Sequence, residues 1–277
     1  MSCLPAQITE LDANVKLLVQ QFRDTKRVQQ FLLPKHNDFF IARYLTARKF
    51  DVENAITMFI NMIVWKNEMD IDNIHKQFNK NRYKDYLLKY WPSSILWDDH
   101  PRTNDGSIIL FGMVGNVDPE IVNIVGLDTI MQYHIICMER MENIWLKNVE
   151  TLGYWPGFVI FDDIGNVSMR SLSSENLNVC QQLVNITQSY YPDMLRKMFI
   201  FNVPSMFYIP WKIIQLWIDP RTIAKQEFHS GGIESIEDKI FQVIARDQLP
   251  NRLKGTYEKD IPKGGKAEKL PMQLDDD

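Results

Sequence analysis

The segment FDDIG holds the pair of side chains best suited to chemistry in this sequence of 277 residues. Asp162 and Asp163 follow the apolar run FVIF, so they stand at the carboxyl end of an expected strand, where α/β sheets place ligands. Paired carboxylates there bind a divalent cation, as in a metal-dependent hydrolase, or they cap backbone N–H groups of the following turn. No third carboxylate lies nearby in the sequence, which favours the turn.

The signatures of common enzyme classes are otherwise absent. The sequence has no G-x-S-x-G elbow, no G-x-x-x-x-G-K phosphate loop and no G-x-G-x-x-G after its first expected strand. The histidines show no spacing typical of metal ligands; they are His36, His75, His100, His134 and His229. We therefore expect a binding protein rather than an enzyme, with no metal site and no cofactor.

The segment PWKIIQLWI, residues 210–218, is apolar on nearly every side. Pro210 fits a first helical turn, and Asp219 with Pro220 ends the helix after about two and a half turns, too few to span a bilayer. Such a helix is either buried or faces lipid. Tryptophan prefers the membrane interface. Each basic residue near this segment would add about 1 kcal/mol of binding free energy at an anionic surface. A core helix and a movable, membrane-touching flap both remain open.

The elements that would position these residues fall into two parts. Residues 8–90 are expected to be helical, because apolar positions recur at helical spacing after Asp51, a candidate N-cap. Beyond the turn-rich stretch WPSSILWDDHPRTNDG, β-rich runs at 107–114, 157–164 and 197–203 alternate with helical patterns at 127–150, 172–190 and 235–247. Residues 224–230 are a candidate for a further strand. This alternation predicts an α/β domain with a mostly parallel sheet flanked by helices.

The composition is that of a globular protein, with 45% hydrophobic and 24% charged residues. A net charge of −4 gives no general attraction to nucleic acid. Cys3, Cys137 and Cys180 are odd in number and widely separated, which favours a reducing compartment. We see no secretory signal, lipidation motif or membrane-spanning run, so we expect a soluble cytoplasmic protein with reversible membrane contact.

Four motifs follow one another in an order that is specific as a combination. IARYLTARKFDV, residues 41–52, is similar to L-R-F-L-R-A-R-K-F-D-V, with Thr46 in place of an arginine, and Trp65 follows. SYYPDMLRKMFIFNVP and WIDPRTIAK are similar to Y-P-E-R-L…I-N-A-P and F-L-D-P-K-T…K. LPNRLKG keeps the leucine, proline and last glycine of L-P-x-x-Y/F-G-G but departs between them. Over residues 10–255 the chain thus resembles the CRAL-TRIO, or Sec14-like, lipid-transfer family.

The resemblance implies a helical region over residues 1–90, a lipid-binding domain over 91–255 and a polar tail over 256–277. Members of this family hold one hydrophobic lipid in an α/β cavity under a mobile helix, which implies that PWKIIQLWI is this gate. The expected gate and membrane contacts are Phe207, Tyr208, Trp211, Lys212, Ile214, Trp217 and Arg221. The expected pocket lining is Phe111, Met113, Phe158, Ile160, Val167, Met169, Phe199 and Phe201.

The resemblance also implies a phosphatidylinositol headgroup site, at Arg48, Asp193, Thr222 and Lys225. The two bases neutralise phosphate, threonine adds a neutral hydrogen bond and the acid accepts from inositol hydroxyls. Asp193 replaces the commoner glutamate and reaches one methylene less far. Val167 and Met169 stand where the family's phosphatidylcholine binders carry small hydroxylated residues, which argues against recognition of choline lipids.

We therefore predict a cytosolic protein that binds one lipid, preferably phosphatidylinositol, and exchanges it at anionic membranes. One alternative is a carrier of a sterol, tocopherol or retinoid, which needs apolar area more than polar contacts. Another is a lipid-regulated protein-interaction module without transfer activity.

Overall fold

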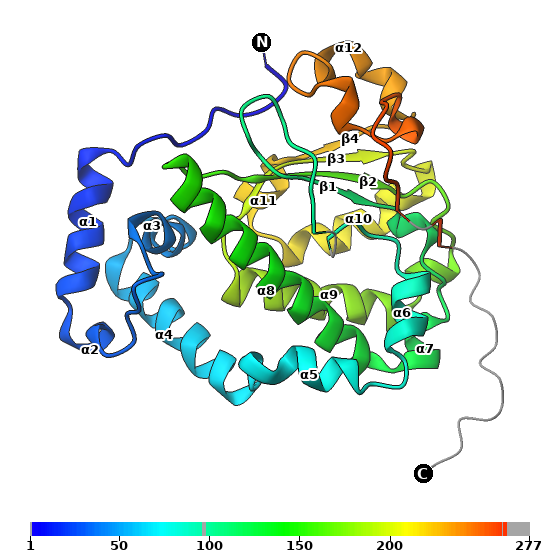
Figure 1. Cartoon of the computed structure of the whole chain (residues 1–277). Coiled ribbons are helices and arrows are strands. Elements are labelled where there is room, and N and C mark those ends of the chain that lie inside the picture. The colour runs from blue at the N-terminus through cyan, green and yellow to red at the C-terminus, as the bar shows by residue number, and fades with distance from the viewer. Residues whose placement is uncertain (1, 96–97, 262, 265–277) are drawn as a thin grey trace.

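Helices make up the N-terminal part of the computed structural model, which describes residues 2–95, 98–261 and 263–264. They are α1 (Ala13–Asp24), α2 (Lys26–Gln29), α3 (Asp38–Ala47), α4 (Val52–Glu68), α5 (Ile74–Asn79) and α6 (Lys84–Tyr90). Figure 1 shows α1 to α4 grouped at one end of the molecule, with α5 and α6 running along its lower side. The side chain of Asp51 accepts from the N–H of Asn54, so the predicted N-cap of α4 is confirmed.

The buried face of α4 follows the predicted helical spacing. Ile56, Phe59 and Met62 are buried, at intervals of three residues. The ring of Phe59 meets Phe22 of α1 edge-on at 5.6 Å and Tyr44 of α3 at 5.5 Å. These aromatic contacts join the three helices into one small core.

Four parallel strands, paired in chain order, form the sheet. They are β1 (Ile109–Gly112), β2 (Phe158–Asp163), β3 (Leu195–Phe201) and β4 (Gln226–Phe228). Each overlaps a predicted run, including the further candidate at 224–230. Helices α8 (Leu127–Leu152) and α9 (Ser174–Tyr190) cover one face, and α12 (Glu237–Ile240) lies over the other (Figure 1). The α/β architecture with a parallel sheet is thereby confirmed.

Successive side chains along each strand point to opposite faces of the sheet. Odd-numbered positions pack under the C-terminal segment 233–261 as a layer of phenylalanines, at Phe111, Phe161, Phe199 and Phe201. Even-numbered positions take the helical side, where Phe158 joins the main core. Met198 and Ile200 join a smaller cluster there. Because the sheet is covered on both faces, the two sets are equally apolar.

The predicted helix over residues 235–247 is wrong. The structure has only α12 there, with 3-10 turns at Ile233–Ser235 and Arg246–Gln248. Ile236, Ile240 and Ile244 are buried at helical spacing, which is why the pattern predicts one long helix. Asn104 instead donates its side-chain amide to the carbonyl of Gln242 at 3.3 Å and its backbone N–H to that of Val243 at 2.9 Å. An external segment thus takes the acceptors that a continued helix would use.

The remaining short helices are α7 (Ile121–Val125), α10 (Tyr208–Ile214) and α11 (Pro220–Ala224). Within the residues that the structure describes, no helix is both long and apolar enough to cross a membrane.

Candidate functional site

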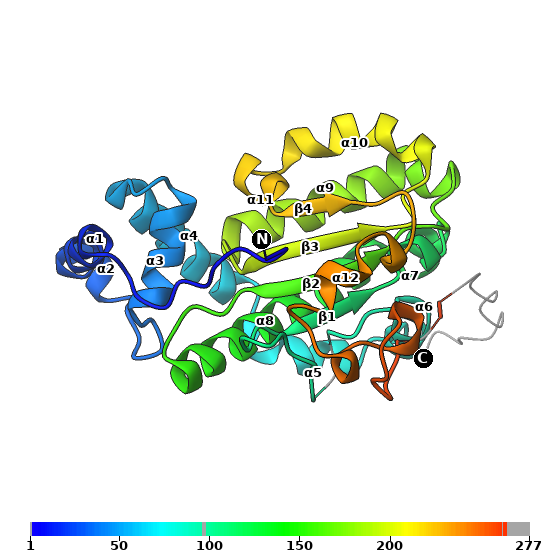
Figure 2. The same cartoon turned by 90° about the horizontal axis from the view of Figure 1, so that it is seen from above.

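The expected gate lies within residues 205–218, which we call the gate from here on and which consist of α10 between the 3-10 turns Ser205–Phe207 and Gln215–Trp217. Figure 2 shows α10 along an outer edge of the molecule, beside α9. Its inner side is apolar, because Ile214 is buried and the ring of Trp211 lies 4.7 Å from that of Phe228 on β4. Its outer side is apolar too, with Ile209 75% and Leu216 79% exposed. The gate is thus apolar on its inner side, and its outer side combines exposed aliphatic side chains with Tyr208 and Lys212.

The predicted gate residues are divided between these two sides. Phe207, Trp211 and Trp217 are half-buried and Ile214 is buried, whereas Tyr208 and Lys212 are exposed. The sequence prediction missed the three exposed aliphatic side chains, which are Ile209, Ile213 and Leu216. Their spacing of four and three residues is the signal that would have found them, since it places them on one side of a helix.

The gate packs on a small hydrophobic cluster, which we call the gate cluster. Its buried members are Ile164, Ile200 and Val203, and its partly buried members are Val167, Met198, Phe207 and Phe228. These residues come from the even-numbered side of β3, from β4, from the turn after β2 and from the start of the gate. They form the layer between sheet and gate.

Two of the four predicted headgroup residues form an ion pair. Nζ of Lys225 lies 2.5 Å from Oδ1 of Asp193, and both side chains are partly exposed. Asp193 lies between α9 and β3 in the left-handed region, with φ 56°, and Lys225 is the C-cap of α11. The ends of two elements thus place an acceptor and a cation side by side.

The other two predicted headgroup residues belong to segments that touch. Arg48 is exposed at the end of α3, and Thr222 lies within α11. Arg221 joins these helices, because its guanidinium donates to the carbonyls of Thr46 and Ala47. All four predicted residues therefore come from segments in mutual contact. Arg221, which we expected to meet the membrane, has these carbonyls as partners.

A buried charge cluster that sequence reasoning missed orders the loop before Asp193. Glu142 of α8 lies 3.3 Å from Nη2 of Arg43 and 2.6 Å from Nζ of Lys66. Burial alone would raise the pKa of Glu142, but the two cations hold it below its usual value. Arg43 Nε also donates to the carbonyl of Pro192 at 2.9 Å. The cluster therefore ties α3, α4 and α8 to the residue next to Asp193.

The ion pair of Asp193 and Lys225 borders a pocket of about 130 Å³. Its other walls include Trp155, Leu195 and the N-terminal arm, by which we mean residues 2–8. Trp155 donates its backbone N–H to the carbonyl of Ile8 at 2.9 Å, which fixes the end of the arm. The arm thus closes one side of the pocket.

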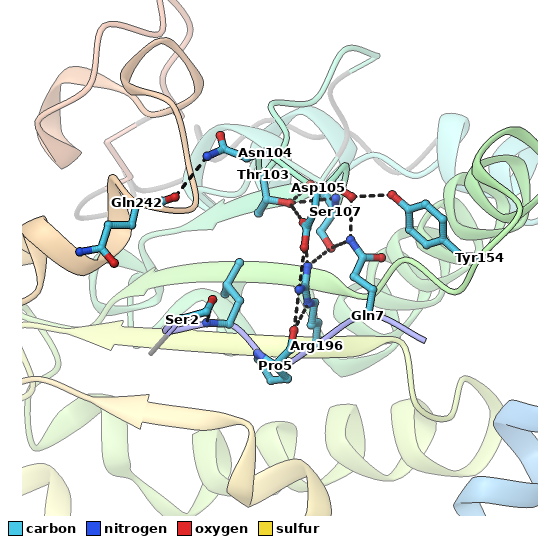
Figure 3. A network of polar contacts seen from close by, with 11 residues as sticks. Ser2, Pro5, Gln7, Thr103, Asn104, Asp105, Ser107, Tyr154, Arg196 and Gln242 are labelled. Atoms are coloured by element: carbon cyan, nitrogen blue, oxygen red, sulfur yellow. Dashed lines mark hydrogen bonds and ion pairs between the residues drawn. The ribbon is translucent and has the colours of Figure 1, made fainter. Parts of the chain in front are cut away.

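Arg196 holds the middle of the arm (Figure 3). Its guanidinium donates to the carbonyl of Pro5 and, at 2.8 and 2.9 Å, to both carboxylate oxygens of Asp105. Burial would raise the pKa of Asp105, but the hydrogen bonds from Arg196 and Thr103 lower it to about 2. The carboxylate therefore stays charged, and the arm is held by a charge-assisted network.

The predicted pocket residues do not share one lining. Three of them fill the layer under the C-terminal segment, on the face of the sheet away from the gate: Phe111, Phe199 and Phe201. Met113 packs against that layer as well. Phe158 and Ile160 belong to the main core, and Met169 is 72% exposed. Val167 alone among the eight belongs to the gate cluster.

The two carboxylates of FDDIG have different surroundings. Asp163 accepts from the N–H of Gly165 at 2.8 Å and from the amide of Asn202 at 2.9 Å, which is the turn-capping role. Asp162 Oδ1 fills the space over Gly112, where a Cβ would lie only 1.7 Å away. Burial raises the pKa of Asp162 to about 6. Among the described residues no group of three or more histidine, cysteine or acidic side chains is placed to hold a metal ion.

A second pocket, of about 390 Å³, lies at the carboxyl ends of β1 and β2. Its lining comes from residues 115–120 and from Asn166, Ser168, Arg170 and Ser171, and it contains no residue of the gate. This pocket is larger than the one beside Asp193, and Val117 and Pro119 contribute apolar surface to its lining.

Comparisons with known proteins agree over most of the chain. Residues 8–61 match the model of the CRAL/TRIO N-terminal domain, and residues 99–255 match that of the CRAL/TRIO domain. The chain is 26% identical over 249 residues to the phosphatidylinositol/phosphatidylcholine transfer protein SFH12 of Arabidopsis thaliana, covering 88% of this chain and 44% of that protein. It is 25% identical over 274 residues to the SEC14 cytosolic factor of Kluyveromyces lactis, covering 92% and 82%.

A solved structure shows the same fold. The crystal structure of Sfh5 superposes with a TM-score of 0.62 at 15% identity, covering 81% of this chain and 83% of that one. The chain spans less than half of the length of the Arabidopsis relatives that it matches.

Proposed function

Because the chain belongs to the CRAL/TRIO family, we propose that it binds one lipid between its sheet and the gate and exchanges that lipid at membranes. The observation that carries this proposal is the row of three exposed aliphatic side chains on the outer side of the gate. Ile209, Ile213 and Leu216 stand in water, and contact with a bilayer would recover about 25 cal/mol for each Å² of apolar surface. The names of the similar transfer proteins support a carrier rather than an enzyme. We place this carrier in the cytoplasm, with transient membrane contact.

We assign the acyl chains to the gate cluster rather than to the layer of phenylalanines. Ile200→Trp would fill the space between sheet and gate, and we expect it to lower lipid loading at least tenfold. Ile200→Val at the same position should load like the unchanged protein, and melting curves would show that both variants fold. Equal loading of the two variants would contradict this lining.

Phosphatidylinositol is our preferred ligand, on the chemistry around Asp193 and Lys225. A phosphodiester would replace the carboxylate as partner of Lys225, and the released Asp193 would accept from ring hydroxyls. Thr222 and Arg48, on touching segments, would add a hydroxyl and a second cation. The two basic side chains of this site, Lys225 and Arg48, also favour contact with anionic membranes.

The first test is to purify the protein under native conditions and identify the co-purified lipid by mass spectrometry. We expect phosphatidylinositol to co-purify with the unchanged protein and with Lys239→Ala, a control at an exposed position. We expect Lys225→Ala to lose it. A sterol or isoprenoid alone would favour the alternative carrier and remove the headgroup role from the four residues. A bound lipid without transfer between vesicles would favour the interaction module.

A further inference from the structure

The side-chain amide of Gln188, near the end of α9, grips the backbone at the C-terminal end of the gate. Nε2 donates to the carbonyl of Trp217 at 2.6 Å, and Oε1 accepts from the N–H of Asp219 at 2.5 Å. Only one orientation of the amide satisfies both partners, since the first is an acceptor and the second a donor. One side chain thus fixes both peptide groups that flank Ile218.

This contact lies where the gate meets a fixed helix. Asp219 is the N-cap of α11, and its carboxylate accepts from the N–H of Arg221. Arg221 binds α11 to α3 through the carbonyls of Thr46 and Ala47. Among the described residues no side-chain hydrogen bond anchors α10 in this way, and the helix packs through side chains such as Trp211. Residues 217–219 therefore form the link at which the gate would rotate against α11, and we call them the hinge.

The same end of α9 leads to the headgroup pair within five residues. Tyr190 stacks on Trp65 of α4 at 3.9 Å, and its carbonyl accepts from Tyr44. Pro192 is held by Arg43, and Asp193 by Lys225. These contacts make the end of α9 a fixed base. The hinge is thus attached to the most strongly anchored part of the site.

We propose that Gln188 is a positioning residue that holds the gate in its docked position by clamping this hinge, an inference that rests on the proposed function. Opening the gate breaks both backbone hydrogen bonds, and docking restores them. Because the clamp bonds backbone and not ligand, it stabilises the docked gate equally with and without lipid. It therefore sets the rates of uptake and release but not the affinity.

Gln188→Ala tests this separation of rate from affinity. We expect the rate constants for uptake and for release of a fluorescent-acyl phosphatidylinositol to rise together by about tenfold, the worth of two neutral hydrogen bonds. Kd should stay within twofold, and backbone amides of residues 205–219 should exchange hydrogen faster. Asn185→Ala, at an exposed position one turn earlier on α9, should change none of these quantities.

Gln188→Glu provides a readout that a merely structural role would not give. Above its pKa the carboxylate cannot donate to the carbonyl of Trp217, so lipid exchange should be fast. The protonated carboxyl has one donor and one acceptor, like the amide, so acidification should return the rate toward that of the unchanged protein. The titratable and charged groups on the surrounding elements are Asp219 and Arg221 beside the hinge, His134 of α8, which bonds Thr187 at 2.9 Å, and the paired Lys66, Glu139 and Glu142 of α4 and α8. The Gln188→Ala variant retains all of these groups, so its rate of lipid exchange should not show the return on acidification.

Unchanged hydrogen exchange in the gate of Gln188→Ala, or a loss of affinity without faster exchange, would overturn the clamp. A Gln188→Glu protein whose rate follows the same pH profile as Gln188→Ala would overturn it too. If the unchanged protein takes up no lipid, the proposed function fails, and hydrogen exchange at residues 205–219 then decides the clamp by itself.

Discussion

Asp162 carries a partly buried carboxyl whose raised pKa opposes folding at neutral pH. Burial raises its pKa from 3.8 to about 6, so the folded protein keeps a proton that the unfolded chain releases between these values. Stability is therefore lost as the pH rises through this window, and the loss is complete above it. Asp162→Asn keeps the shape over Gly112 and removes the titration.

We expect Asp162→Asn to raise the free energy of unfolding at pH 7.5 by up to about 3 kcal/mol, which corresponds to roughly two pKa units. At pH 3.5 the variant and the unchanged protein should be equally stable. Urea unfolding at the two pH values measures both differences. A destabilised variant at pH 7.5 would show that the ionised carboxylate has a favourable partner.

Glu142 has the opposite dependence. Its lowered pKa means that its contribution is present above the usual pKa of 4.5 and is lost as the pH falls through the lower folded value. Glu142→Gln removes the carboxylate that faces the buried Arg43 and leaves Lys66 paired with Glu139, which should cost about 3 kcal/mol of stability. Thermal and urea unfolding measure this loss of stability. The same change at the exposed Glu150 on the same helix, Glu150→Gln, should leave the stability almost unchanged.

At the scale of elements, the outer side of the gate makes a separate prediction. Ile209→Asp with Leu216→Asp should weaken binding to anionic vesicles by at least tenfold, because each apolar side chain contributes about 1.5–3 kcal/mol when it enters an apolar phase. Stability should be unaffected, since both side chains stand in water. Leu17→Asp on α1, where the leucine is also exposed, is the matched control for sedimentation with vesicles. Equal loss in the control would contradict a specific gate contact.

The elements were predictable from sequence to different degrees, for physical reasons. The strands β1, β2 and β3 could be found because each is an apolar run between turn signals, whereas β4 (Gln226–Phe228) is mostly polar. Which face Phe111 or Leu110 takes could not be found, since a parallel sheet covered on both faces has no polar alternation. The helix over 235–247 was overpredicted because Asn104, more than 130 residues away in the chain, takes its carbonyls.

The candidate site was predictable where each partner belongs to a recognisable motif, and not where helix packing alone brings two residues together. Asp193 and Lys225 were found through their motifs, and the structure pairs them. Helix packing alone brings Gln188 to the hinge. It also brings together Arg43 and Glu142, which are 99 residues apart in the chain. Sequence spacing carries no signal for such contacts.

At the scale of the whole molecule, the N-terminal arm is a structural part of the CRAL/TRIO domain. Leu4 is buried in the layer of phenylalanines, whereas Ile8 is largely exposed. We expect Leu4→Ala to lower the free energy of unfolding by about 2–4 kcal/mol and Ile8→Ala by much less. Urea unfolding gives the two values, and faster hydrogen exchange at residues 2–8 would show that the arm has come loose. Equal costs for the two variants would contradict this docking.

The bond from Arg196 to Pro5 joins residues 191 positions apart in the chain. During synthesis at about 5–20 residues per second, the arm therefore waits roughly 10–40 s before β3 exists to receive it. For that interval Leu4 stays in water, where chaperones and proteases reach it. Docking of the arm is thus one of the last events of folding. A substitution that disrupts β3 would therefore be detected first as release of the arm, at the N-terminal end of the chain.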